Sequence, residues 1–149
     1  MDPKTTTGTY MGNSLFIDTG AFIARINAGD QHHAEAVEAW ESLRMSNLGL
    51  FSSEPVLIES ANFISREQGC RFAARWARRH LESEEIRWLQ PGREDFEAAA
   101  DNLEKYSDQR LSFTDAVSFA LMRRHGIRRV FGFDRHFAMA GFELWSPPA

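Results

Sequence analysis

The chain has 149 residues, 43% of them hydrophobic, and a formal net charge of −4. These values are typical of one globular domain with a sizeable core, and they exclude a wholly disordered chain. A transmembrane helix is excluded because no run of 18 apolar residues is present, and an internal disulfide is excluded because Cys70 is the single cysteine.

The first stretch of the chain, 1–13, is rich in threonine and glycine and lacks the apolar core of a signal peptide. We expect it to be a flexible tail in front of a single domain at 14–149. The missing signal peptide and the lone cysteine favour a cytoplasmic protein.

Short apolar runs with strand character alternate along the chain with longer segments whose apolar residues recur at helical spacing. Pro55 lies in the first turn of one such segment, where proline is tolerated, and Gly126 ends another. The pattern predicts strands at 14–18, 48–53, 86–89 and 129–134, a fifth short strand at 142–145, and helices at 19–28, 31–45, 54–67, 70–83, 93–106 and 114–125.

Strands that are separated by helices predict right-handed crossovers, and therefore an α/β fold with a parallel sheet of four to five strands and helices on both faces. In such a sheet the ligand site lies at the carboxyl ends of the strands. Asp18 ends the first predicted strand and Asp134 ends the fourth. We therefore expect both carboxylates at the same edge of the sheet.

Each acid of interest also has a structural explanation. Asp18 and Asp134 precede helical stretches, where aspartate is a good N-cap, and Asp115 follows Ser112 at the spacing of a capping box. Glu59 lies at the edge of the apolar arc of its helix, where its carboxylate can stay in water. Two acids at strand ends and two on helices can, however, also converge in one cleft.

Converging carboxylates repel one another and raise one another's pKa unless a cation joins them. Hard divalent cations such as Mg²⁺ and Mn²⁺ prefer oxygen ligands of this kind. No spacing of histidine and cysteine indicates zinc, and the adjacent His32 and His33 would point in different directions on a helix. The acids therefore predict a Mg²⁺ or Mn²⁺ site.

Three motifs together resemble the PIN-domain ribonucleases, and in particular the VapC toxins of bacterial and archaeal toxin–antitoxin pairs. They are FIDTGAF at 16–22, PVLIES at 55–60, and LSFTDAVSFALMRRHGIRRVFGFDRHFAMAGFEL at 111–144. The last motif is the most specific, and the resemblance covers about residues 15–144. It implies the three-layer PIN-like fold, with a parallel sheet between helices.

The resemblance further implies a metal-dependent endoribonuclease, the toxin of a type II toxin–antitoxin module, which hydrolyses RNA phosphodiester bonds with Mg²⁺ or Mn²⁺. The family's catalytic and metal-binding acids fall on Asp18, Glu59, Asp115 and Asp134, and a supporting hydroxyl falls on Thr114. The division of roles among the acids stays open, because Glu59 could bind metal or orient the attacking water.

Two positions near these acids need separate comment. Gly20 stands where many relatives carry a small polar residue, so a water or phosphate contact from that side chain is lost here. His136 lies two residues after Asp134, and either an RNA contact or a structural role is open for it.

The negative net charge argues against a nucleic-acid partner, but the arginines are clustered. The clusters are candidate tracks for an RNA backbone or ordinary solvated helix faces, and they comprise Arg71, Arg75, Arg78 and Arg79, then Arg123, Arg124, Arg128 and Arg129.

The resemblance also implies a homodimer and a small antitoxin that wraps over the toxin and presents a basic side chain to the acids. Several aromatic residues near the first two acids are candidate anchors for this partner, although each could equally belong to the core. They are Phe22, Trp40, Phe63, Phe72 and Trp76.

Three other functions are alternatives to the metal-dependent endoribonuclease. One is a housekeeping or catalytically silent PIN-like module that binds RNA or protein, and another is a purely structural interaction protein. The third is a metal-dependent phosphatase, which commonly needs a second aspartate two residues after the first. Gly20 occupies that position after Asp18, which disfavours the phosphatase.

Overall fold

The computed structural model describes residues 12–149 of the chain. The expected flexible tail therefore lies almost entirely outside the described residues, and it stays a prediction. At the start of the described part, the carbonyl oxygen of Asn13 accepts a hydrogen bond from the backbone N–H of Gly49 at 2.7 Å.

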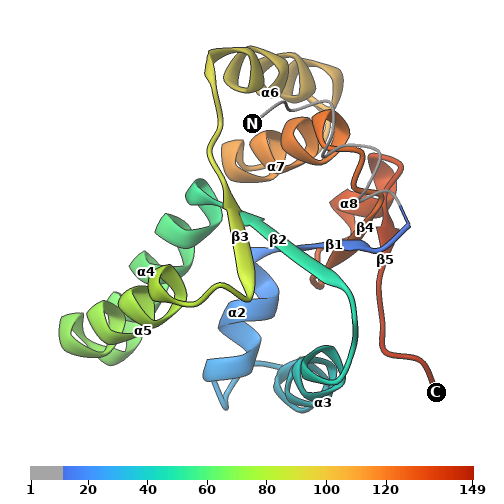
Figure 1. Cartoon of the computed structure of the whole chain (residues 1–149). Helices are drawn as coiled ribbons and strands as arrows, with labels where there is room; N and C mark the ends of the chain where they lie inside the picture. Colours follow the sequence, from blue (N-terminus) through green and yellow to red (C-terminus); the bar gives the residue numbers. More distant parts are fainter. Residues whose placement is uncertain (1–11) are drawn as a thin grey trace.

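The described part of the chain contains one sheet of five parallel strands in the order β3-β2-β1-β4-β5 (Figure 1). This confirms the predicted α/β fold and places the first strand in the centre. The strands are β1 (Ser14–Ile17), β2 (Gly49–Ser53), β3 (Ile86–Leu89), β4 (Arg129–Phe131) and β5 (Glu143–Leu144).

Helices cover both sides of this sheet, with α6 and α7 on one side and α2 and α3 on the other (Figure 1). None of the described helices is both long and apolar enough to cross a bilayer. The helices are α2 (Thr19–Ile26), α3 (His33–Arg44), α4 (Glu54–Gln68), α5 (Cys70–Glu82), α6 (Arg93–Lys105), α7 (Phe113–Arg124) and α8 (His136–Met139).

The structure differs from the sequence-based expectation after β4. The strand was expected to reach Asp134, but it ends at Phe131, and α8 follows it. The apolar run Arg129–Asp134 looks like one strand in sequence, and a helix of four residues is too short to show helical periodicity. Asp134 therefore lies in the connection between β4 and α8.

Local sequence signals explain where two helices begin. Ser53 caps α4, because its hydroxyl accepts a hydrogen bond from the N–H of Val56, and Pro55 occupies the first turn. Ser112 caps α7 by accepting from the N–H of Asp115 at 3.0 Å, and the Asp115 carboxylate accepts from the Ser112 N–H at 3.4 Å. The expected capping box is therefore present.

The core lies on both faces of the central strand. Leu15, Phe16 and Ile17 of β1 are fully buried, so the sheet must be covered on both sides. Helix α7 contributes an unbroken buried segment from Asp115 to Met122. One end of this helix is therefore fixed in the core, and its first turn carries one of the candidate acids.

An ion pair ties α6 to α7. Both oxygens of the buried Asp95 accept hydrogen bonds from the Arg124 guanidinium at 2.9 Å, and one of them also accepts from the Gly92 N–H at 2.8 Å. Burial alone would raise the pKa of Asp95, but the bonds from Arg124 and Gly92 outweigh it and hold the pKa below its usual range. The pair therefore stabilises the ionised carboxylate.

Replacing Arg124 with methionine is expected to destabilise the protein by about 1–3 kcal/mol, because Asp95 would remain buried without its cation. Arg93→Met is the matched control, since the Arg93–Glu97 pair is exposed and should contribute little. Urea unfolding at neutral pH measures both changes. Equal stability of the two variants would contradict the role given to Arg124.

Candidate functional site

Asp18 follows β1 directly and is the most buried of the candidate acids. Its backbone N–H donates to the carbonyl of Phe131 at 2.9 Å, which ties it to the end of β4. It occupies the N-cap position of α2, but its side chain makes no cap hydrogen bond. The expected capping role is therefore wrong for this side chain, and another explanation is needed for a carboxylate that is 4% exposed.

Hydrogen bonds compensate the burial of the Asp18 carboxylate only in part. Among the described residues, its Oδ1 atom is buried and has no hydrogen-bond partner. Burial raises the pKa of Asp18 well above its usual value, and the neighbouring Asp115, Glu59 and Asp134 raise it further. A hydrogen bond from the Thr19 backbone opposes this only in part. Such a group is costly in a folded protein unless a cation compensates it.

Gly132 makes room for Asp18. A Cβ atom at this glycine would lie 3.0 Å from the Cβ of Asp18 and 3.4 Å from its Oδ2, which is closer than ordinary van der Waals contact. The end of β4 can therefore approach the Asp18 side chain only because residue 132 has no side chain. Sequence reasoning missed this residue, because nothing in the sequence shows how closely the two strand ends approach.

Asp115 lies in the first turn of α7, held by the capping box with Ser112. Burial and the neighbouring Asp134 raise the pKa of Asp115 to about 6, with a further contribution from Glu59. The hydrogen bonds with Ser112 lower it in part. Asp115 therefore both caps α7 and lies beside the other acids.

Asp134 lies in the connection between β4 and α8. Its Oδ1 accepts a hydrogen bond from the His136 backbone N–H at 2.9 Å, and the Nδ1 atom of the same histidine lies 2.8 Å from this oxygen. Asp115, Asp134 and His136 each offer a ligand atom, and these atoms lie within 4.8 Å of one another. The structure thus brings His136, whose role the sequence left open, to the acids.

Glu59 and Thr114 lie at the periphery of this group. Both line a shallow pocket of about 440 Å³ between α4, α6 and α7. Glu59 raises the pKa of Asp18 and of Asp115, so its carboxylate lies within electrostatic range of both. It does not belong to the compact group of three ligand atoms. Thr114 is half-buried next to Asp115.

The four acids therefore share one electrostatic environment at the carboxyl ends of β1 and β4. The donors are carboxylate oxygens with one nearby imidazole, and the buried Oδ1 of Asp18 lacks a partner among the described residues. Oxygen donors and unneutralised negative charge suit a hard divalent cation. The residues present thus fit Mg²⁺ or Mn²⁺ on chemical grounds.

Comparisons with known proteins point to one family. The family model described as PIN domain matches residues 15–143. The 23S rRNA-specific endonuclease VapC20 of Mycobacterium tuberculosis is 34% identical over 128 residues, which are 86% of this chain and 95% of that protein. The crystal structure of VapC20, described as a Sarcin-Ricin loop cleaving toxin, has a TM-score of 0.80 at 33% identity and covers 89% of this chain and 99% of that one.

More distant structures share the fold. VapBC2 from Rickettsia felis, bound to a promoter DNA fragment, has a TM-score of 0.65 at 13% identity and covers 89% of this chain and 97% of that one. FitAcB from Neisseria gonorrhoeae has a TM-score of 0.60 at 12% identity over the same shares. Since the family model spans most of the chain and VapC20 is similar over nearly its whole length, this chain belongs to the PIN-domain family.

Proposed function

We propose that this protein is a Mg²⁺- or Mn²⁺-dependent endoribonuclease that acts as the toxin of a type II toxin–antitoxin module in the cytoplasm. The observation that carries the proposal is the buried carboxylate of Asp18, whose pKa is raised first by burial and then by three neighbouring acids. A protein has no reason to maintain this repulsion unless a cation joins the group. The similarity to VapC20, an endonuclease by name, gives the reaction class.

In this proposal Asp18, Asp115 and Asp134 hold the cation, and Glu59 either completes the set or orients and deprotonates the attacking water. A bound divalent cation would neutralise the phosphodiester and make water more acidic. His136 would position Asp134 through the short contact between its Nδ1 and the Oδ1 of that carboxylate. Thr114, beside Asp115, would support the site from the rim.

Ribosomal RNA is the substrate class that we propose to test first. VapC20 is named for its action on 23S rRNA, and it is 34% identical to this chain. A catalytically silent PIN-like module is the competing function. It is disfavoured because it would gain nothing from clustered acids, and the experiments below separate the two.

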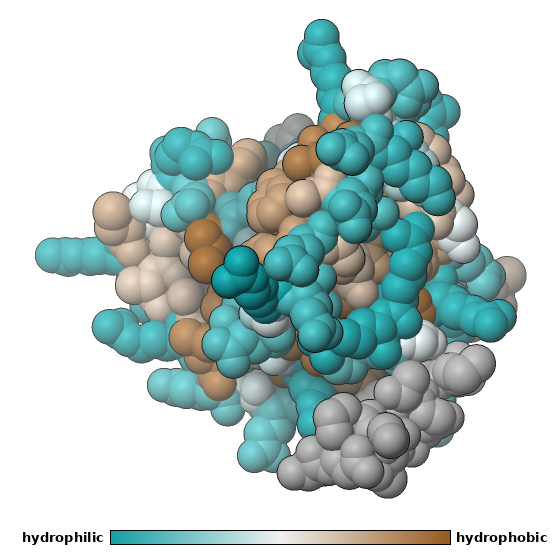
Figure 2. Space-filling view, turned by 90° about the horizontal axis from the view of Figure 1, so that it is seen from above, coloured by the Kyte–Doolittle hydropathy of each residue, from teal (hydrophilic) through white to brown (hydrophobic). Residues whose placement is uncertain are grey.

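A partner protein and a second copy complete the proposal. A small antitoxin would present a basic side chain to the acids, since unneutralised carboxylates attract an arginine as readily as a metal. Figure 2, which looks down on the α6 side, shows hydrophobic patches between hydrophilic side chains. Three large apolar residues of α4, α6 and α7 are exposed, and we propose that they support a homodimer: Ile58, Phe96 and Phe113.

Replacement of single acids tests the catalytic proposal. Asp18→Asn, Asp115→Asn and Asp134→Asn are each expected to lower Mn²⁺-dependent RNA cleavage by on the order of a hundredfold or more, because each removes a ligand charge. Asp101→Asn, an exposed position on α6, is the control. Gel analysis of rRNA in Mn²⁺ and in EDTA provides the measurement, with circular dichroism to verify folding.

Wild-type turnover in a folded Asp115→Asn protein would show that the site assignment is wrong. Absence of cleavage by the wild-type chain on both intact ribosomes and free RNA would favour the silent module.

The metal-free stability should depend on pH through Asp115. Its pKa of about 6 lies above the usual value of 3.8, so the folded state binds the proton more tightly and loses stability as pH rises from about 4 to 6. In EDTA at pH 8, Asp115→Asn should therefore be about 1–3 kcal/mol more stable than the wild type, and this advantage should vanish near pH 4.

Asp95→Asn is the matched control, because Asp95 also accepts a hydrogen bond at the start of a helix but has a lowered pKa. It should be less stable than the wild type at pH 8, since it loses the ionic bond to Arg124. Chemical denaturation at pH 4, 6 and 8 tests both signs. A stabilised Asp95→Asn, or an Asp115→Asn that is destabilised at pH 8, would refute the electrostatic account.

A pair of glycines tests the geometry around Asp18. Gly132→Ala should weaken Mn²⁺ binding by about tenfold or more, because the added Cβ would displace the Asp18 carboxylate. Gly20→Ala should bind Mn²⁺ normally, since its Cβ would meet only Phe133 at 3.8 Å. Isothermal titration with Mn²⁺ measures both affinities. Equal Mn²⁺ affinity of the two variants would show that Gly132 does not determine the geometry around Asp18.

A further inference from the structure

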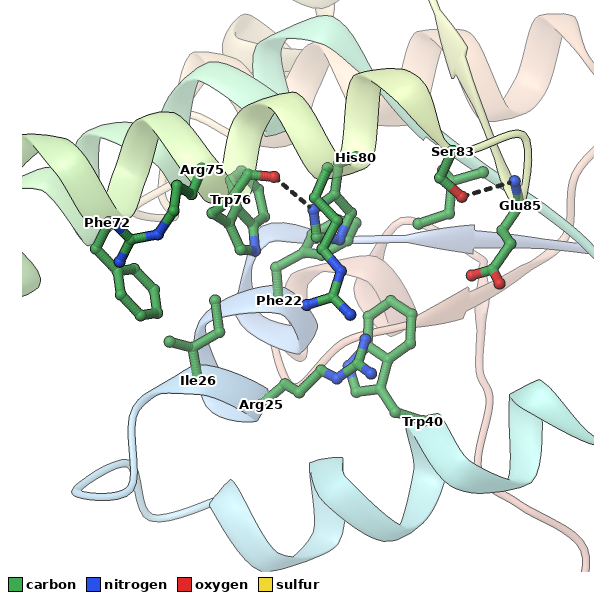
Figure 3. A pocket seen from close by; sticks show the side chains of 12 residues that line it. Phe22, Arg25, Ile26, Trp40, Phe72, Arg75, Trp76, His80, Ser83 and Glu85 are labelled. Carbon is green, nitrogen blue, oxygen red and sulfur yellow. Dashed lines mark hydrogen bonds between the residues drawn. The ribbon is translucent and has the colours of Figure 1, made fainter.

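Aromatic side chains near α2 fall into two groups that differ in exposure. In the first group, the ring of Phe22 lies against those of Trp40 and Trp76 (Figure 3), and the three residues are 1%, 8% and 8% exposed. They belong to the core, as the alternative explanation for the candidate anchors held. The second group comprises His32 and Phe133, and the proposed catalytic mechanism uses neither of them.

The rings of His32 and Phe133 form a parallel stack. Their centroids are 4.3 Å apart, and the angle between the two ring planes is 1°. His32 precedes α3, whereas Phe133 lies in the connection between β4 and α8, so the stack joins segments that are far apart in the sequence. The imidazole is therefore a flat ring that a second ring supports from behind.

Phe133 fixes this stack beside the acids. It directly precedes Asp134, and its Cδ2 atom would lie 3.9 Å from a Cβ atom at Gly20, in the first turn of the helix that Asp18 precedes. Its ring also meets that of Phe131 in β4 edge to face, with centroids 6.1 Å apart. The stack therefore lies at the same edge of the sheet as Asp18 and Asp134.

The backbone of His32 is held in place by its neighbours. Its N–H donates to the Asp30 carboxylate at 2.8 Å, and its carbonyl oxygen accepts from the Ala36 N–H at 2.9 Å. The next residue, His33, contacts the carbonyl oxygen of Ala24 in α2 through its Nδ1 atom at 2.7 Å. These bonds fix the start of α3 against α2, so the imidazole is preorganised for binding.

Solvent still reaches the imidazole of His32. Its side chain is 36% exposed, although Phe133 covers one face of the ring. Glu35 lies 3.7 Å from Nδ1, which is an atom of the ring edge. Within residues 12–149, no ring besides that of Phe133 stacks on His32. The imidazole is therefore available as a stacking surface, unlike the buried rings around Phe22.

We propose that an unstacked base of single-stranded RNA stacks on the exposed imidazole of His32 while a neighbouring phosphodiester lies at the acids. This inference rests on the proposed function for RNA as the substrate. Single-stranded RNA is often recognised through bases that stack on aromatic side chains, including histidine. Every base has a π face, so this contact orients the strand and leaves the choice of sequence to other groups.

A side chain of a protein partner fits this surface less well. An apolar anchor fills an apolar pocket, whereas the exposed part of the stack is a polar imidazole beside the carboxylate of Glu35. A base combines a flat face with polar edges, so it can cover the ring while its edges stay in water. The position next to Asp134 also suits a nucleotide that flanks the cleaved bond.

Two substitutions of His32 separate stacking from simple packing. Phenylalanine keeps a flat ring, whereas leucine can cover Phe133 but offers no ring face. The full chain with Asp115→Asn is the parent protein, and it is kept in EDTA so that the RNA stays intact. Mixed-sequence single-stranded RNA oligonucleotides, each with 2-aminopurine at one position, are the probes. Filter binding gives their affinity, and the fluorescence of 2-aminopurine falls where this base stacks.

We expect His32→Leu to weaken RNA binding by about tenfold and His32→Phe to stay within about twofold of the parent. The fluorescence decrease should disappear in the leucine variant and persist in the phenylalanine variant. Gln31→Ala, at an exposed neighbouring position, is the control and should change neither readout.

Three results would overturn the proposal. Equal RNA affinity of the leucine and phenylalanine variants would reduce His32 to a packing residue. An equal loss in both variants relative to the parent would indicate a hydrogen bond from the imidazole in place of stacking. Absence of RNA binding by the parent would leave no base to stack.

Mn²⁺ affinity tests whether His32 acts through its neighbour instead. Isothermal titration of the chain with His32→Leu as its single change should give the affinity of the wild type. A loss of Mn²⁺ affinity as large as the loss of RNA affinity would assign the ring to positioning Asp134 through Phe133, and would overturn direct stacking.

RNA cleavage by the wild-type chain in Mn²⁺ separates this proposal from the proposed function. RNA binding that depends on the ring at position 32, without any cleavage, would support the stacking site and reject the ribonuclease. Cleavage together with RNA binding that is indifferent to His32→Leu would reject the stacking site alone.

Discussion

The buried carboxylate of Asp18, at the ends of β1 and β4, constrains the residues that can surround it. Asp18 is held there by its backbone bond to Phe131 and by the absence of a side chain at Gly132. Burial and the neighbouring acids raise its pKa, so the ionised carboxylate is destabilised in the folded protein. Strongly shifted pKa values of this kind are typical of functional sites.

The same fold shows how a buried aspartate is stabilised when its role is structural. Asp95 and Asp115 each accept a hydrogen bond at the beginning of a helix, and the two helices pack together. Arg124 neutralises Asp95, whereas the charged groups that act on the pKa of Asp115 are the acids Asp134 and Glu59. The contrast indicates that the raised pKa of Asp115 comes from its burial beside other acids and not from the local helix geometry.

Periodicity and strand–helix alternation predicted the parallel sheet and every long helix, because these elements are long enough to carry a pattern. The short helix α8 and the early end of β4 were missed, since four residues carry no periodicity. The acids were identified by resemblance, and the structure places them in one electrostatic environment. The role of Gly132 depends on how closely the ends of β1 and β4 approach each other, which no local pattern encodes. The contact of His136 with Asp134, by contrast, joins residues two apart in the sequence.

We expect a divalent cation to bind between these carboxylates. Anomalous diffraction from crystals soaked in Mn²⁺ locates such an ion without depending on activity. A peak should lie at about 2.0–2.3 Å from carboxylate oxygens of at least two of Asp18, Asp115 and Asp134. An ordered site without any peak, or Mn²⁺ bound only to acids elsewhere on the surface, would show that these carboxylates do not hold the cation.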